Sequence, residues 1–191
     1  MGGICVFPTN NDTVIKAPFT KVGGKLQPAP LVDPKGKREP LQAGTCTAQA
    51  VLWCKKVLSG VSLETSRPKE LAAGILQTVF INAGNVRADK ATNQMNTLLE
   101  ATGLKCGGGY RLIPTEITAK VCENPGVYLI FTTRHAIAAK TGEGTFYYFE
   151  PENGLWLFNI RPDFRRAIHK NYMSEAADPG VRWAAFELAL D

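Results

Sequence analysis

The sequence predicts an α+β fold, in which helices from the first half of the chain pack on an antiparallel sheet from the second half. Between residues 46 and 103, apolar side chains recur at helical spacing, and glycines stand where helices are expected to end. After residue 126, β-branched and aromatic runs alternate with short polar or glycine-containing links, as is typical of strands. A block of helices followed by a block of strands is the α+β pattern.

The first expected helix begins at Cys46 and is apolar around most of its circumference. Its segment reads CTAQAVLWCKKVL, and Gly60 follows as a residue suited to the left-handed position just past a helix end. Because this helix has almost no polar face, we expect it to be buried.

Two more helices are expected before residue 104. Ser66 is a suitable cap for the second helix, with Pro68 in its first turn. Its apolar face is expected at Leu71, Ile75 and Val79. The third helix is expected from about Asp89 to Thr102, ended by Gly103. Its apolar face is expected at Met95, Leu98, Leu99 and Thr102.

The second half supplies the strands. The runs GVYLIFTT, HAIAAK and TFYYFE are expected to be strands, and residues 141–144 (TGEG) are expected to form a hairpin turn between the last two. LWLF and VRWAAFELAL are further strand candidates. The intervening PDFRRAIHKNY is expected to be a short basic helix or a loop.

Length and composition predict one globular domain with an appended arm. Residues 1–40 are rich in Pro, Gly, Lys and Asn and are expected to be an irregular N-terminal arm, with the domain in residues 41–191. The formal net charge of +5 favours acidic partners, but the basic residues are dispersed. No nucleic-acid motif is present, so no nucleic-acid partner is expected.

Cysteine usage and apolar patterning bear on the compartment. The five cysteines include no CxxC pair, which predicts neither a disulfide framework nor a zinc ribbon and favours a reducing environment. The N-terminus lacks the basic and apolar regions of a signal peptide, and no apolar run is long enough to be a transmembrane segment. We therefore expect a cytoplasmic protein, or one that is secreted or delivered into a target cell by a signal-peptide-independent route.

Cys46 is the candidate nucleophile because of its position. The free N–H groups and the dipole at a helix start lower a thiol pKa and favour the thiolate. The alternative is a small buried hydrophobe, which is the role we expect for Cys54 in the same helix. Cys106 and Cys122 are also expected to be structural.

Two histidines limit the possible mechanisms. Multi-histidine metal sites are excluded, and no metal or cofactor is expected. His169 lies among basic residues and is expected at the solvated surface. His135 opens a strand after an apolar run, at a sheet end from which it can reach a helix terminus. It is the candidate base for the Cys46 thiol, and the alternative is a core histidine.

A third residue is expected on the neighbouring strand, where it would fix the tautomer of the histidine. Counting through the hairpin places Glu150 roughly opposite His135. Glu150 is alternatively a solvated strand end, and Asn153 is the reserve candidate because an amide also orients an imidazole. For the oxyanion hole we expect the backbone N–H of Cys46 and the side chain of Gln42.

Three segments, GTCTAQAVLW, RHAIAA and YYFEPENG, resemble the motif set of YopT-type papain-like cysteine protease effectors of pathogenic bacteria. In that family a Gly-x-Cys helix start is followed by a tryptophan, a His-Ala dipeptide begins a strand, and an aromatic-Asp-Pro-Asn-x-Gly turn supplies the third member. Here Trp53 follows Cys46, Ala136 follows His135, and Glu150 replaces the aspartate. The similar region runs from about residue 42 to 158.

The resemblance implies a papain-like cysteine protease domain in residues 41–191 and cleavage of a protein or peptide substrate through a thioester. It also implies an effector or toxin role in a host or rival cell. The same residues would serve an amidase, a glutamine deamidase or an acyltransferase, because a fold does not dictate a function. The non-enzymatic alternative is a basic binding module in which Cys46 and His135 are packing residues.

Overall fold

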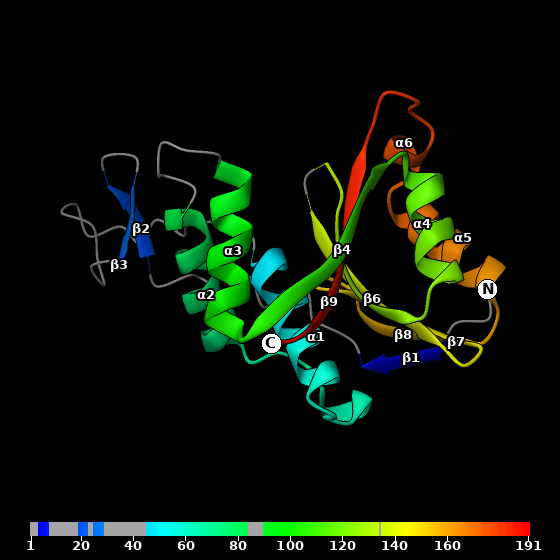
Figure 1. The fold of residues 1–191 in the computed structure, drawn as a ribbon, viewed down its shortest axis with the longest axis horizontal. Coiled ribbons are helices and arrows are strands. Elements are labelled where there is room, and N and C mark those ends of the chain that lie inside the picture. The colour runs from blue at the N-terminus through cyan, green and yellow to red at the C-terminus, as the bar shows by residue number, and fades with distance from the viewer. Residues whose placement is uncertain (1–3, 8–18, 23–24, 29–44, 84–89, 134) are drawn as a thin grey trace.

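The architecture is a sheet with helices on both faces, seen in a computed structural model that describes residues 4–7, 19–22, 25–28, 45–83, 90–133 and 135–191 (Figure 1). The main sheet has seven strands in the order β1-β8-β7-β6-β5-β9-β4. In the described residues, all strand pairs of this sheet are antiparallel, and helices precede most of its strands. The predicted α+β class is therefore confirmed.

The helices and strands have the following bounds. In chain order they are β1 (Ile4–Phe7), β2 (Phe19–Val22), β3 (Lys25–Pro28), α1 (Cys46–Leu58), a 3₁₀ turn (Leu63–Thr65), α2 (Glu70–Ala83), α3 (Lys90–Thr102), β4 (Leu104–Leu112), α4 (Pro114–Glu123), β5 (Gly126–Phe131), β6 (Ala136–Gly142), β7 (Thr145–Glu150), β8 (Gly154–Phe158), α5 (Arg161–Asn171), α6 (Met173–Ala176) and β9 (Trp183–Leu190). Within the expected N-terminal arm, β1 pairs with β8 at the edge of the main sheet, and β2 pairs with β3. The rest of that arm lies outside the described residues.

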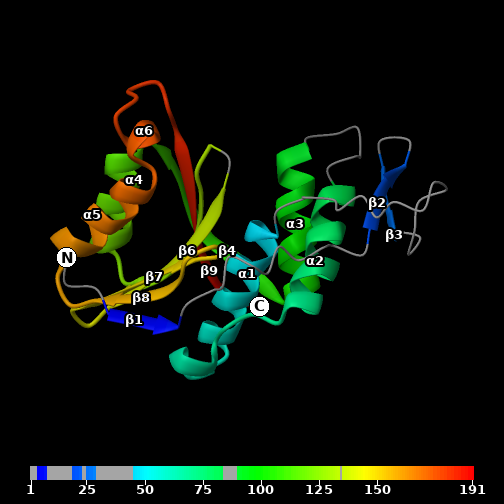
Figure 2. The same cartoon turned by 180° about the vertical axis from the view of Figure 1, so that it is seen from behind.

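Helix α1 begins and ends where the sequence predicts. Cys46 is its first residue, and Gly60 follows the C-cap Ser59 with φ of +76°, a conformation that glycine adopts without a Cβ penalty. Lys55 and Lys56 lie in its last turn, where positive charge complements the helix dipole. Figures 1 and 2 show α1 between the sheet and the α2–α3 pair, which explains why the helix is apolar on most sides.

Helix α2 differs from its prediction in both start and face. It begins at Glu70, and Ser66 instead ends the preceding 3₁₀ turn, with its hydroxyl donating to the carbonyl of Leu63 (2.7 Å). Ile75, predicted on the buried face, is 52% exposed. Gln77 is buried instead, because its Oε1 accepts a hydrogen bond from the N–H of Ala48 in the first turn of α1 (3.1 Å). A polar side chain therefore points inward here to satisfy a helix-terminal donor.

The predicted hairpin is present, whereas β4 had no sequence signal. Glu143 and Gly144 have φ of 52° and 75°, as a two-residue type I′ turn requires, and Gly142 pairs with Thr145. Strand β4 contains three successive glycines, which give no alternating pattern, and it forms by pairing with β9. The basic segment near residue 165 is helical, as α5.

Alternating side chains of the sheet build two cores, one on each face. On the α1 face, sheet residues packed with α1 to α3 include Val127, Leu129, Ala136, Ala138, Phe149 and Leu155. On the opposite face, sheet residues packed with α4 and α5 include Tyr128, Ile130, Ile137, Tyr148, Phe158 and Trp183. The small side chains of Ala136 and Ala138 allow α1 to lie close to β6.

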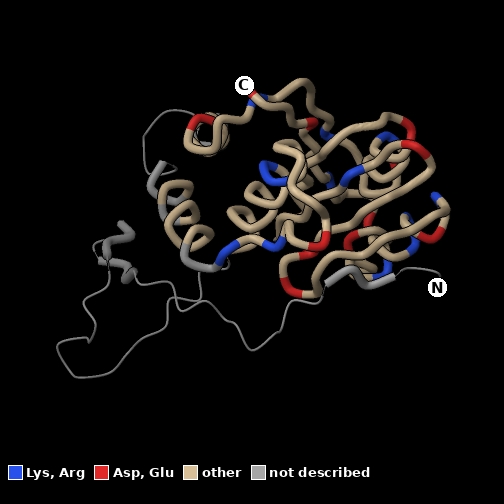
Figure 3. The backbone as a smooth tube through the Cα atoms, turned by 90° about the horizontal axis from the view of Figure 1, so that it is seen from below, with Lys and Arg blue, Asp and Glu red and all other residues tan. Residues whose placement is uncertain are grey.

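Two global properties complete the description. In the described part of the chain, no helix has the length and apolarity needed to cross a bilayer. Lysine, arginine, aspartate and glutamate are interspersed along the described backbone (Figure 3), in agreement with the dispersed charge of the sequence.

Candidate active site

The fold brings Cys46, His135 and Glu150 together at the start of α1 and the adjoining end of the sheet. Cys46 is the first residue of α1, His135 immediately precedes β6, and Glu150 is the last residue of β7. The Cys46 and His135 side chains form a hydrogen bond, and His135 Nε2 forms a second hydrogen bond with Glu150 Oε1. The three residues form one continuous chain of contacts.

The surroundings of Cys46 favour its thiolate. Burial opposes ionisation, but hydrogen bonding with His135, the charge of His135, and hydrogen bonds from the Ala136 backbone and the Thr47 side chain outweigh it. The pKa of the Cys46 thiol is therefore lowered from its ordinary value. The Cys46 N–H is at the first helical position, where no carbonyl of the same helix can accept from it.

The surroundings of His135 favour its charged form. Burial lowers its pKa, but hydrogen bonds and charge interactions with Cys46 and Glu150 outweigh burial and raise the pKa of His135 to about 10. Because Nε2 contacts Glu150, Nδ1 is the nitrogen left to face the thiol. Both shifts favour the thiolate–imidazolium form of the pair over its neutral form.

Both oxygens of the Glu150 carboxylate have hydrogen-bond partners, one from His135 and the others from the turn after β7. Oε1 contacts His135, while Oε2 accepts from the backbone N–H of Glu152 (3.0 Å) and from Asn153 Nδ2 (2.6 Å). The side chain is only 3% exposed. Glu150 is therefore not a solvated strand end, and the Asn153 amide donates to Glu150 instead of bonding His135.

The strand register explains how Glu150 reaches His135. Ala138 pairs with Phe149, so the register continues with Glu150 across from Ile137, two residues beyond His135. The two residues are diagonal neighbours on adjacent strands, within the roughly opposite placement that the sequence predicted. Long side chains bridge a diagonal of about 7–8 Å across a sheet, and the contact forms.

An aromatic stack connects the helix of the thiol to the strand of the carboxylate. Trp53, two turns after Cys46, stacks on Phe149 with centroids 5.5 Å apart and an interplanar angle of 11°. Both side chains are fully buried. Phe149 directly precedes Glu150, so this contact fixes α1 relative to the end of β7.

The second predicted oxyanion donor cannot be placed. Gln42 lies outside the described residues, whereas the Cys46 N–H is at the helix start, as expected.

The three cysteines that were predicted to be structural differ in environment. Cys54 and Cys122 are buried, and burial raises the pKa of both thiols, whereas Cys106 is exposed on β4.

Two residues near the site had no signal in the sequence. The ring of Tyr172 lies 6.2 Å from that of His135, and it packs edge-on against Trp183. Glu175 Oε2 accepts from the N–H of Thr133 (3.0 Å) and from the indole N–H of Trp183 (2.7 Å). Glu175 thereby ties the loop that carries His135 to β9. Tyr172 lies between α5 and α6, and Glu175 lies in α6, where no motif marks either residue.

We expect Glu175→Ala to lower kcat/KM by about 10-fold, because losing an acceptor for two N–H groups costs roughly 1–3 kcal/mol. Trp183 would be left with a buried, unpaired indole N–H. Glu175→Gln keeps an acceptor oxygen and should recover most of the activity. Steady-state kinetics and Tm of both variants test this, and equal losses in the two variants would contradict a positioning role.

Three solved structures match the chain, one of them with a TM-score above 0.5. The crystal structure of the Pseudomonas avirulence protein AvrPphB is similar with a TM-score of 0.61 and 15% identity, covering 77% of this chain and 92% of that chain. PatoxP, a cysteine protease-like domain of the Photorhabdus asymbiotica toxin PaTox, has a TM-score of 0.45 and 12% identity, covering 80% and 50%. The ubiquitin-specific protease encoded by murine cytomegalovirus tegument protein M48 has a TM-score of 0.45 and 12% identity, covering 78% and 79%.

The likeness to AvrPphB concerns the fold. AvrPphB is a YopT-family cysteine protease effector, so the papain-like fold implied by the sequence resemblance is confirmed. No protein-family model and no curated protein sequence matches the chain.

Proposed function

We propose that this protein is a papain-like cysteine peptidase that cleaves a protein substrate through a thioester intermediate. The observation that carries the proposal is the contact chain from Cys46 at a helix start, through His135, to the doubly held carboxylate of Glu150. The fold shared with AvrPphB, a cysteine protease, supports it.

Each residue has a defined step in this mechanism. The Cys46 thiolate attacks the carbonyl carbon of a peptide bond, and the Cys46 N–H, with Gln42 as proposed second donor, stabilises the oxyanion. The His135 imidazolium gives its proton to the leaving amine, which leaves a thioester on Cys46. Neutral His135 then takes a proton from water, the resulting hydroxide attacks the thioester, and the acid product leaves as the thiolate and imidazolium re-form. Glu150 orients His135 and stabilises its charge.

We also propose that the substrate is a protein of a host or rival cell into which the chain is delivered. The fold shared with an avirulence protein supports an effector or toxin role.

Mass spectrometry of a treated proteome tests the proposed reaction. Cell lysate proteins are incubated with the full chain or with its Cys46→Ala variant, and new N-termini are labelled and sequenced. New N-termini that appear only with the parent chain support a peptidase. Glutamine residues that gain about one dalton without chain scission would instead identify a deamidase and overturn the peptidase assignment.

We expect kcat/KM to be highest between two pKa values set by the pair. On the acid side, kcat/KM falls when the pH drops below the lowered pKa of Cys46, because the thiolate gains a proton. On the alkaline side, kcat/KM falls near pH 10, because the His135 imidazolium loses its proton. Glu150→Gln removes a charge that raises the His135 pKa, so the alkaline limb should move to lower pH. A pH–rate profile of both proteins measures this shift, and an alkaline limb that does not move would contradict the assigned contact.

A further inference from the structure

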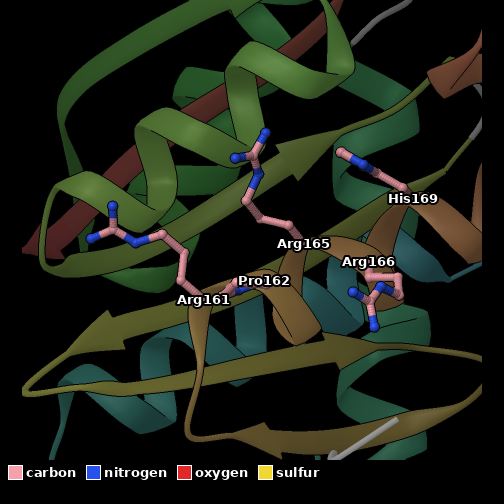
Figure 4. Close-up of a pocket in the computed structure, with 5 residues that line it drawn as sticks. All are labelled: Arg161, Pro162, Arg165, Arg166 and His169. Atoms are coloured by element: carbon pink, nitrogen blue, oxygen red, sulfur yellow. The ribbon is translucent and has the colours of Figure 1, made fainter.

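Helix α5 lines a basic pocket that the proposed mechanism does not use. The pocket has a volume of about 410 Å³ and is lined by Arg161, Pro162, Arg165, Arg166 and His169 (Figure 4). Among the described residues, no hydrogen bond or ion pair joins this lining to Cys46, His135 or Glu150. The pocket lining and the candidate active site therefore share no residue.

Helical spacing and contacts with α4 orient the lining side chains. Arg161, Arg165 and His169 are four residues apart, which places them on one face of α5, and Figure 4 shows the two arginines extending toward α4. Arg165 donates to the carbonyl of Thr115 (3.3 Å). His169 Nε2 lies 2.9 Å from the Thr118 hydroxyl, so His169 is half-buried and not at the solvated surface as the sequence predicted. The pocket is preorganised by two helices.

The side chains that line this pocket include three arginines and no carboxylate. Asp163, also on α5, pairs with Arg166 (3.3 Å). Like charges four residues apart on a helix destabilise it slightly. Burial and the nearby Arg165 charge lower the pKa of His169, so its neutral form is favoured here. An anion would relieve both effects.

We propose that this pocket binds the phosphate groups of a phosphorylated ligand. Arginine forks hydrogen-bond phosphate oxygens in pairs, and a phosphate dianion offers enough oxygens for both Arg161 and Arg165. Its charge also exceeds that of a single carboxylate, which suits a pocket lined by three arginines. The charge of the bound anion is expected to raise the pKa of His169. The ligand is a soluble polyphosphate or a lipid phosphate headgroup, two sources of the same chemistry.

Histidine NMR and calorimetry with pyrophosphate test the site in the full chain. We expect saturable binding, and a ring signal of His169 whose titration moves to higher pH when pyrophosphate is present. Arg165→Gln should weaken binding by 10-fold or more, and Arg161→Gln should do the same without touching the Thr115 contact. The matched control Arg111→Gln removes an exposed arginine on β4 and should change the affinity less than twofold.

Vesicle binding separates the two phosphate sources. If the ligand is a lipid headgroup, the chain should sediment with phosphatidylcholine vesicles containing phosphatidic acid, and Arg161→Gln should abolish this. Pyrophosphate binding without vesicle binding assigns a soluble ligand. Binding to neither probe overturns the proposal, and so does equal weakening by Arg111→Gln and Arg161→Gln, because that result indicates general charge attraction.

Discussion

Replacing Cys46 with alanine is expected to lower kcat/KM by about 10⁴- to 10⁶-fold, because loss of the nucleophile removes the whole covalent pathway. Cys46 is only partly buried at the first position of α1, so the substitution opens little volume. Circular dichroism and Tm should match those of the parent chain. Turnover is measured on the substrate found by N-terminal sequencing. Activity within 10-fold of the parent would rule out the mechanism.

Two other cysteines provide controls for this prediction. Cys106→Ala changes an exposed thiol on β4 and should alter neither kcat/KM nor Tm. Cys54→Ala removes a fully buried thiol that donates to the Tyr128 carbonyl (3.7 Å), so it should lower the free energy of unfolding by about 1 kcal/mol and keep kcat/KM. Iodoacetamide should modify Cys46 faster than Cys106, because the hydrogen bond and charge of His135 lower the pKa of the Cys46 thiol.

Replacing Glu150 is expected to give the second-largest loss, with kcat/KM about 10³- to 10⁴-fold lower in Glu150→Ala. The alanine leaves His135 without the carboxylate that fixes its tautomer and stabilises its charge. It also leaves the N–H groups of Glu152 and Asn153 without their acceptor. Kinetics of this variant beside His135→Ala measure how far the carboxylate acts through the histidine.

Glu150→Gln should be nearly as damaging, about 10²- to 10⁴-fold, although glutamine has the same size. Glu150 accepts hydrogen bonds at both oxygens, whereas glutamine has one oxygen and one NH₂ group. If the glutamine oxygen faces His135, its NH₂ meets the N–H donors of Glu152 and Asn153. If the NH₂ faces His135 Nε2, the imidazole must carry its proton on Nδ1, where it cannot accept the thiol proton.

Asn153→Ala separates the two candidates for the third position. The variant keeps the Glu152 N–H on the Glu150 carboxylate and loses one hydrogen bond, so kcat/KM should fall by only about 10-fold. A crippled Asn153→Ala together with active Glu150 variants would reverse the assignment. Full activity in both alanine variants would leave only a Cys–His pair.

Parts of this structure were predictable because their signals are local. The buried helix from Cys46 is marked by its apolar sequence and by Gly60, and the hairpin is marked by the glycines of its turn. Because His135 and Glu150 belong to the two arms of the same hairpin, counting along its two strands was enough to predict that they lie close together. The count did not resolve that the two residues are diagonal neighbours, because that depends on the exact register of β6 and β7.

Other parts depend on tertiary contacts that a single segment does not encode. The buried face of α2 is set by Gln77, whose partner is the backbone of a different helix. Strand β4 has glycines where apolar residues would have marked it, and only β9 makes it a strand. Glu175 acts on the His135 loop across 42 residues of sequence, through a backbone N–H that no sequence pattern displays.

Two thiols on α1, Cys46 and Cys54, allow the docking of this helix on the sheet to be measured by alkylation. The reactivity of Cys46 is enhanced while α1 is docked on the sheet, because the partners that lower its thiol pKa, His135 and Ala136, belong to the strand layer. Cys54 is sealed by the same docking, with its sulfur against the Tyr128 carbonyl of β5. Transient lifting of α1 would therefore slow alkylation at the first thiol and start it at the second. The ratio of the two labelling rates measures the docked fraction, without any substrate.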